Sequence, residues 1–217
     1  MIRRLLNLLF PPKCLLCRGF LSKHETHLCH KCRVDTPEFT KSKIKHSFIA
    51  RWTSLWYYKD MARRSILRYK FYNRRSYVNS FARLLSVKLQ KENFDDFDIL
   101  TWVPVSTLRE IRRGYDQVEL LAYAIGKELN VTPVCTLKKI RNTPPQSSIR
   151  EYAHRRANVM GVYRVLSPEQ IAGKRILLLD DVITSGATAT ECAKTLLVAG
   201  AKEVCFAAIA ATEHKKR

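Results

Sequence analysis

The sequence is poor in several features that would place it in a specialised class of protein. Its 217 residues include only 7 glycines and 8 prolines, too few for a collagen-like or low-complexity chain. No apolar run reaches the roughly 18 residues that a membrane-spanning helix needs. Acidic residues are also scarce, with 19 Asp and Glu against 39 Lys and Arg. What remains is a globular, non-membrane chain with a strong excess of positive charge.

The first ten residues begin like a secretory signal, with Arg3 and Arg4 followed by leucines. The apolar stretch is too short for a signal peptide, however. Two prolines, Pro11 and Pro12, also stand where small residues would be needed for cleavage. We therefore expect a cytoplasmic protein.

The positive charge is both large and clustered. The formal net charge is +20 and the pI is near 9.9. A basic surface kept only for solubility would scatter its charges evenly, whereas seven Lys or Arg and one acid fall between Lys59 and Arg75. Further clusters are formed by Arg109, Arg112 and Arg113, and by Arg150, Arg155 and Arg156. This pattern favours nucleic acid or another phosphate-rich partner.

Four cysteines in the first 32 residues form a C-x2-C-x11-C-x2-C pattern, at Cys14, Cys17, Cys29 and Cys32. Each C-x2-C pair can bind one ion from a tight turn, and two pairs complete a tetrahedral site. Two disulfides are the alternative, which fits poorly with a chain that lacks a secretory signal. The pattern predicts one structural zinc ion, because four thiolates leave no coordination position for a reacting water. Cys135, Cys192 and Cys205 have apolar neighbours and are predicted to be core residues.

The remainder of the chain predicts an α/β fold with a mostly parallel sheet flanked by helices. Strands are expected over residues 52–58, 98–105, 131–137, 174–181 and 203–210. Helices are expected over residues 61–68, 77–89, 115–129 and 187–199, with a helical turn or two over 149–156. We divide the chain into a zinc module with its basic linker, residues 1–45, and an α/β domain, residues 46–217.

The most informative segment follows the predicted strand over residues 174–181. Four apolar residues, 176–179, indicate a strand buried on both faces. Asp180 and Asp181 come next, followed by a run of small and hydroxyl residues and then a helix. Backbone N–H groups at such a turn suit a phosphate, and the carboxylates suit ribose hydroxyls or a water-bridged magnesium ion. A plain strand-to-helix loop would leave the paired acids unexplained.

This segment resembles the phosphoribosyl pyrophosphate motif of type I phosphoribosyltransferases. The resemblance implies that Asp180 and Asp181 contact the ribose. It also implies that the 5′-phosphate loop consists of Thr184, Ser185, Gly186, Ala187 and Thr188. Magnesium would accompany a phosphoribosyl pyrophosphate ligand.

Two further stretches narrow the resemblance. Residues 112–122, RRGYDQVELLA, resemble an Arg-Arg-Gly-aromatic-Asn-Gln signature, and residues 143–146 together with 155–158 resemble a second one. With the four-cysteine pattern, these stretches are similar to the ComF family of competence proteins, which is linked to DNA uptake in natural transformation. The chain departs from the family pattern at Asp116, where Asn is usual, and so lacks an amide donor there.

The basic clusters allow two interpretations. The first is that Arg109, Arg112 and Arg113 bind pyrophosphate, because a guanidinium matches phosphate geometry; the second is that they follow a DNA backbone. For single-stranded DNA the candidates are Arg63, Arg64, Arg68, Arg109, Arg112, Arg113, Arg155 and Arg156. Tyr69 and Tyr72 lie among these basic residues as candidates for stacking on bases, although for any one aromatic a place in the core is the better explanation.

Three functions follow from these patterns. The first is a competence factor that binds single-stranded DNA and keeps the phosphoribosyl pocket as a binding site. The second is an active phosphoribosyltransferase in nucleotide metabolism. The third is a zinc-ribbon adaptor that docks a DNA-uptake helicase or channel protein. Charge clustering favours the first, and the paired acids have no place in the third.

Overall fold

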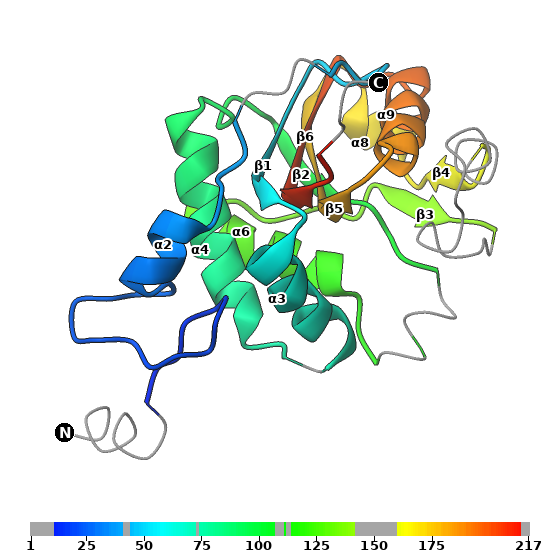
Figure 1. Cartoon of the computed structure of the whole chain (residues 1–217). Coiled ribbons are helices and arrows are strands. Elements are labelled where there is room, and N and C mark those ends of the chain that lie inside the picture. Colours follow the sequence, from blue (N-terminus) through cyan, green and yellow to red (C-terminus); the bar gives the residue numbers. More distant parts are fainter. Residues whose placement is uncertain are drawn as a thin grey trace.

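The computed structural model describes residues 11–40, 44–72, 74–106, 111, 114–141 and 160–213. Within these residues, four parallel strands form the central sheet in the order β1-β6-β5-β2, and a separate antiparallel pair joins β3 to β4 (Figure 1). The strands are β1 (Arg51–Tyr57), β2 (Ile99–Trp102), β3 (Leu137–Lys139), β4 (Tyr163–Val165), β5 (Arg175–Ile183) and β6 (Glu203–Ala211). The helices are α2 (His30–Asp35), α3 (Asp60–Phe71), α4 (Tyr77–Lys91), α6 (Gln117–Leu129), α8 (Pro168–Ile171) and α9 (Ala187–Val198).

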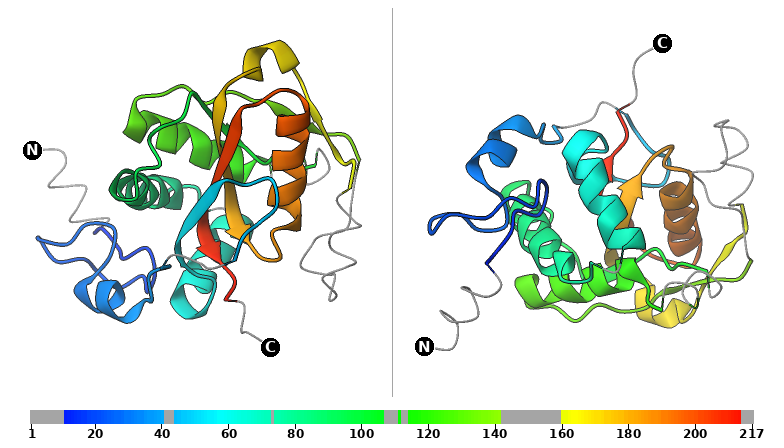
Figure 2. Two further views of the ribbon diagram at one scale, coloured as in Figure 1. Left: turned by 90° about the horizontal axis from the view of Figure 1, so that it is seen from above. Right: turned by 60° about the horizontal axis from the view of Figure 1, so that its bottom comes forward.

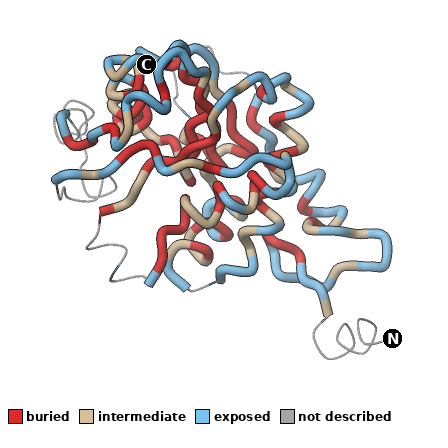
Figure 3. The backbone as a smooth tube through the Cα atoms, turned by 180° about the vertical axis from the view of Figure 1, so that it is seen from behind, coloured by how far each residue is buried: buried red, intermediate tan, exposed pale blue. Residues whose placement is uncertain are grey.

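The sheet is the middle of three layers. Helices α3, α4 and α6 pack on one face, and α9 with the β3–β4 pair packs on the other (Figure 2). The residues of β5 alternate between the two cores: Leu177 and Leu179 join the first, and Ile176 and Leu178 join the second. All four are at most 1% exposed, and the buried backbone passes through the middle of the molecule (Figure 3). The predicted α/β fold with a parallel sheet is therefore confirmed.

The ends of several helices follow from local chemistry. Helix α6 ends at Asn130, which adopts the left-handed conformation that asparagine tolerates. Helix α9 ends just before Gly200, which has a φ of 104°, a backbone conformation that glycine adopts more readily than other residues. Helix α4 buries Phe81, Leu85 and Leu89 at the four-residue spacing of one helix face.

The strand predicted over residues 131–137 is wrong except at its last residue. Pro133 has no N–H to donate within a ladder, so the segment runs beside β2 with few backbone bonds. Val134 donates its N–H to the Leu100 carbonyl, and the hydroxyls of Thr101 and Thr136 lie 2.8 Å apart. The helical turn predicted over 149–156 lies outside the described residues.

The three cysteines predicted as core residues differ in burial. Cys192 is buried on α9, and Cys205 is half-buried on β6. Cys135 is exposed, which makes its prediction wrong, because it belongs to the segment that stays outside the sheet. Within the described residues, no helix is both long and apolar enough to cross a membrane.

Gly126 provides a test of how α6 packs. Ala normally favours a helix over Gly by about 1 kcal/mol. A Cβ at Gly126, however, would stand 2.5 Å from the Val131 carbonyl oxygen and 2.8 Å from a carbon of Pro133. Gly126→Ala is therefore expected to lower the free energy of unfolding by about 1–3 kcal/mol, measured by urea denaturation.

The exposed neighbour Lys127 supplies the control for this substitution. Lys127→Ala is expected to change the free energy of unfolding by less than about 0.5 kcal/mol. A stabilised Gly126→Ala variant would contradict the close approach of α6 to the 131–133 segment.

Candidate functional site

The four N-terminal cysteines come together in the fold. All four Sγ atoms lie within 4.8 Å of one another, and those of Cys17 and Cys29 are 3.7 Å apart. Zinc–sulfur bonds of about 2.3 Å in a tetrahedron place sulfur atoms roughly 3.8 Å apart, so the cluster fits the metal. The N–H groups of Gly19 and Cys29 point at the Sγ atoms of Cys17 and Cys14. The arrangement suits a structural zinc ion.

The thiols of this cluster influence one another's protonation. Burial raises the pKa of Cys14, but the N–H groups of Cys29, Cys17 and Leu16 outweigh it and bring the pKa to about 7. Burial and the three neighbouring thiols raise the pKa of Cys32. Four thiolates at this spacing repel one another, so the fully ionised set needs a cation.

Side chains of α3 form hydrogen bonds to backbone carbonyls of the zinc module. Ser65 of α3 donates a 2.7 Å hydrogen bond to the carbonyl of Leu15, and Arg68 donates to the carbonyl of Leu16. Leu15 and Leu16 lie between the first two cysteines and are at most 2% exposed. The first C-x2-C turn therefore shares a core with α3. Arg68, a candidate for DNA binding, is half-buried and makes its described hydrogen bonds to this turn.

The paired acids stand at the carboxyl end of the central strand. Because side chains alternate along a strand, Asp181 faces α3 and α6, whereas Asp180 lies on the α9 side. Asp180 accepts a 2.7 Å hydrogen bond from the N–H of Asp181. Burial and the negative charge of Asp181 raise the pKa of Asp180, and the nearby Lys70 opposes the rise. Both carboxyl groups lie at the sheet edge where open α/β sheets bind ligands.

Two side chains that sequence reasoning did not assign to the site hold Asp181. The Lys70 ammonium of α3 lies 2.8 Å from Asp181 Oδ1, and the Gln117 amide of α6 donates to Oδ2 at 3.1 Å. Both belong to stretches that the sequence singled out for other reasons, a basic segment and a family signature. The missing information was three-dimensional: only the fold brings the ends of α3 and α6 to this carboxylate.

The predicted phosphate loop, residues 184–188, connects β5 to α9. Gly186 lies immediately before the helix with φ of 75°, so the loop turns through a conformation that favours glycine. The positive end of α9 and the N–H groups of its first turn meet the loop here, as an anion site requires.

The imidazole of His46 lies directly against Gly186. A Cβ at that glycine would stand 2.3 Å from the ring atoms Nδ1 and Cε1. His46 is nine-tenths buried, and its ring packs at 5.1 Å from that of Trp52. The first residue after the basic linker therefore forms one wall of the phosphate loop. The sequence carries no local signal for this contact.

In its contacts with the described residues, the Asp116 side chain acts as a hydrogen-bond acceptor. It caps α6 by accepting from the N–H groups of Val118 at 2.7 Å and Glu119 at 3.1 Å, and it also accepts from Val105 at 3.2 Å. Burial raises the pKa of Asp116, although these three N–H groups oppose the rise. The departure from the family's asparagine is explained, since every described contact uses a side-chain oxygen.

The basic and aromatic candidates for DNA binding have different environments. Arg63 and Arg64 are exposed on α3, and Tyr72 just after it is 70% exposed. Tyr69 is fully buried, so its predicted stacking on bases is wrong. The other five candidates lie outside the described residues, namely Arg109, Arg112, Arg113, Arg155 and Arg156.

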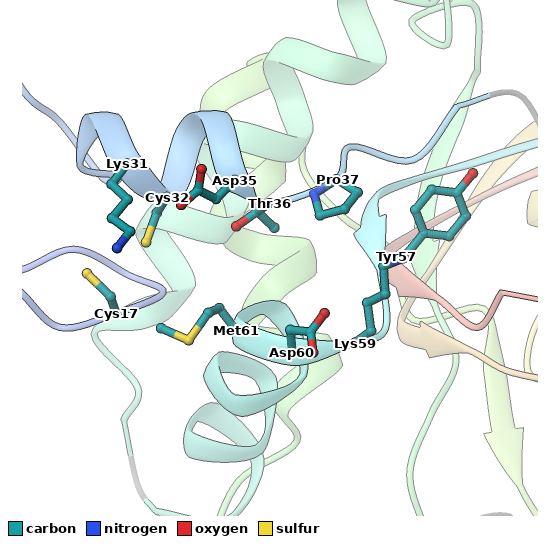
Figure 4. Close-up of a pocket in the computed structure, with 10 residues that line it drawn as sticks. All are labelled: Cys17, Lys31, Cys32, Asp35, Thr36, Pro37, Tyr57, Lys59, Asp60 and Met61. Atoms are coloured by element: carbon teal, nitrogen blue, oxygen red, sulfur yellow. The ribbon is translucent and has the colours of Figure 1, made fainter.

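A cavity of about 290 Å³ lies between the zinc module and the start of α3 (Figure 4). Lys31, Cys32 and Asp35 of α2 line one side, opposite Cys17 and Met61. Its lining shares no residue with the phosphate loop. Lysines and aspartates both line it, so the cavity favours neither sign of ligand charge.

The cluster geometry predicts the behaviour of a cysteine variant. Elemental analysis is expected to find one zinc ion per native chain. Cys29→Ser should lose most of the metal, because a hydroxyl is a far weaker zinc ligand than a thiolate. Cys135→Ser removes an exposed thiol outside the cluster and should keep the metal. A zinc-free native chain, or one with Cys14 in a disulfide, would contradict the assignment.

Two known families match separate parts of the chain. Residues 5–43 match the double zinc ribbon domain family, and residues 119–217 match the phosphoribosyl transferase domain family. Solved structures that match part of the chain include the glutamine phosphoribosylpyrophosphate amidotransferase of Bacillus subtilis, with 21% identity over 65% of this chain and a TM-score of 0.43. The phosphoribosylpyrophosphate synthetase of Mycobacterium smegmatis has 23% identity over 60% of this chain and a TM-score of 0.38. The chain spans about a third of the length of each, 30% and 33% respectively.

Curated relatives match over most of the chain. Competence protein ComFC of Bacillus subtilis is 29% identical over 208 residues, covering 91% of this chain and 83% of the relative. The DNA utilization protein YhgH of Escherichia coli K12 is 28% identical, covering 62% and 60%. Competence protein ComFC of Streptococcus pneumoniae is 31% identical over 180 residues, covering 83% and 74%. With its zinc module and phosphoribosyltransferase-like domain, the chain belongs to the ComF family of competence proteins.

Proposed function

We propose that this protein handles incoming DNA during natural transformation, working in the cytoplasm. It binds single-stranded DNA on its basic surface and a phosphoribosyl pyrophosphate-like ligand at residues 180–188. Relatives named as competence and DNA utilization proteins support the biological role. The observation that carries the molecular part is the β5–loop–α9 unit, which combines paired carboxylates with a helix N-terminus at one sheet edge.

Each part of this unit has a task in binding such a ligand. The loop N–H groups and the α9 dipole hold the 5′-phosphate, and the absence of a side chain at Gly186 lets the loop pass close to the His46 ring. Asp180 and Asp181 accept hydrogen bonds from the ribose hydroxyls. A magnesium ion that arrives with the ligand would neutralise pyrophosphate charge, and the carboxylates suit it through bridging water.

The exposed face of α3 supplies the described part of the DNA-binding surface. Arg64 and Phe71 are seven residues apart and thus share a helix face, and both are exposed. Tyr72 continues this surface beyond the helix. Guanidinium groups for phosphates beside exposed rings for bases are the combination that single strands require. This surface is distinct from the carboxylates, because Asp181 lies beneath α3 and α6 and Asp180 lies on the α9 side of the sheet.

An active phosphoribosyltransferase is the second candidate, and the complete acid-plus-loop unit is the observation that favours it. The reaction would break the bond between ribose C1 and a pyrophosphate oxygen, form a bond from C1 to a base nitrogen, and release pyrophosphate. Arg109, Arg112 and Arg113 would then hold the leaving group. Release of pyrophosphate upon addition of a free base distinguishes this candidate from binding alone.

The zinc module offers a place for a protein partner such as a DNA-uptake helicase or channel. Phe20 and Val34 are each 68% exposed on this module.

The ligand site is tested by removing both acids. Asp180→Ala combined with Asp181→Ala is expected to weaken binding of phosphoribosyl pyrophosphate with magnesium at least tenfold in calorimetry. The reason is that each hydrogen bond to a charged group contributes about 1.5–3 kcal/mol. Asp95→Ala with Asp96→Ala is the matched control, since these adjacent exposed acids precede β2 at the opposite end of the sheet. Equal affinity of native and doubly substituted chains would place the ligand elsewhere.

The DNA surface is tested on the described face of α3. Arg63→Ala and Arg64→Ala should weaken binding of single-stranded DNA with little dependence on base sequence. They should also flatten the slope of log affinity against log salt by about 0.7 for each phosphate that the variant no longer neutralises. Tyr72→Ala should cost about 1–3 kcal/mol of binding per stacked base, nearly independent of salt.

Arg83 serves as the control for these arginines. It is an exposed arginine of α4 paired with Glu128 at 2.9 Å. Arg83→Ala should leave both affinity and salt slope unchanged. The DNA proposal fails if the α3 variants behave like this control.

A further inference from the structure

Lys70, in the last turn of α3, points toward the interior, unlike the exposed basic residues of the same helix. The Lys70 ammonium lies 2.8 Å from Asp181 Oδ1, with only 19% of the lysine side chain and 7% of the aspartate side chain exposed. Arg63 and Arg64, on the same helix, are exposed. The environment of Lys70 is thus the ligand site and not the outer basic surface.

Lys70 belongs to a network of hydrogen bonds that joins α3, α6 and β5. The Tyr69 hydroxyl donates to the Gln117 carbonyl at 2.6 Å, and the Tyr115 hydroxyl donates to the Tyr69 carbonyl at 2.8 Å. The Gln117 side chain in turn donates to Asp181 Oδ2. Asp181 is therefore held at both oxygens by two helices that are themselves tied together.

The charge balance around Asp181 explains why a cation is needed there. Asp180 is the adjacent residue, and the buried Asp116 caps the start of α6 next to Gln117. Among the described residues, Lys70 is the cation in ion-pair contact with this acidic group. Ionised carboxyl groups in such a partly buried cluster repel one another, and a cation beside them keeps Asp181 ionised.

We propose that Lys70 is a positioning residue of the ribose-phosphate site, which fixes Asp181 in the orientation and charge state that accept a ribose hydroxyl. This inference rests on the proposed function of residues 180–188. Each carboxylate oxygen has two lone pairs, so Oδ1 can accept from Lys70 and from a hydroxyl at once. Lys70 thereby acts on the ligand through Asp181.

The test is a double-mutant cycle read out as affinity for phosphoribosyl pyrophosphate with magnesium. Lys70→Met keeps most of the side-chain volume but removes the charge, and is expected to weaken binding about tenfold. In an Asp181→Asn background the same substitution should change affinity less than about twofold, because the charge that Lys70 holds is gone. Lys70→Arg keeps a cation and should restore affinity to within about fivefold of native.

Lys88 provides a matched control. It is a lysine of α4 with 14% of its side chain exposed, paired with Glu92 at 3.0 Å. Lys88→Met should leave ligand affinity unchanged. Lys70→Met should also leave the salt slope of DNA binding unchanged, since its ammonium faces inward. Thermal denaturation without ligand identifies any variant that fails to fold, and in that case Lys70→Gln replaces Lys70→Met.

The outcomes separate the two levels of the proposal. Loss of ligand binding in the Asp180 and Asp181 double variant, with native affinity in Lys70→Met, overturns the role of Lys70 alone. An equal loss from Lys70→Met with and without Asp181→Asn also overturns it, because Lys70 would then act independently of that carboxylate. A native chain that does not bind the ligand overturns the proposed function and this inference together.

Discussion

Burial of β5 on both faces is the constraint on which the rest of the structure depends. A strand covered on both sides needs two layers of helices, and its apolar residues alternate between the two cores. Fully burying each such side chain contributes about 1.5–3 kcal/mol, so four consecutive ones anchor the sheet. The same burial makes the strand's carboxyl end a poorly solvated place for charge. Two carboxyl groups there need partners, which are Lys70 and Gln117 for Asp181 and the Asp181 N–H for Asp180.

Helix α3 contacts three parts of the molecule: the core, the zinc module and Asp181 of β5. Its buried face completes the core with Ile66 and Tyr69, while its polar side chains reach backbone carbonyls of the first C-x2-C turn. Its last turn reaches Asp181. The zinc module is thus part of the same packed unit as Asp181. The ring of His46, just after the linker, adds a second contact to this end of the sheet by packing on Gly186.

How much of this was predictable depends on whether the signal is local. The apolar run of β5, the small residues after Asp181 and the cysteine spacing each describe a contiguous piece of chain, and each predicted its structure correctly. Elements of three or four residues, such as β3, β4 and α8, are too short to show a period. Residues 131–136 do not form the predicted strand, because Pro133 has no N–H to donate to a neighbouring strand. The inward turn of Lys70, the burial of Tyr69 and the contact of His46 with Gly186 depend on residues far away in the sequence. No local pattern distinguishes Lys70 from its exposed basic neighbours.

The pairing of β1 with β6 has a consequence for how the chain assembles. Arg51 lies beside Cys205 in the ladder, so the first strand pairs with the last across about 150 residues. The ladder between β1 and β6 therefore forms only after β6 has been synthesised, and β1 lacks this neighbour until then. The cysteine cluster is different, because its four ligands lie within 19 residues and need no later segment. The cysteine cluster can thus form during synthesis well before the sheet is complete.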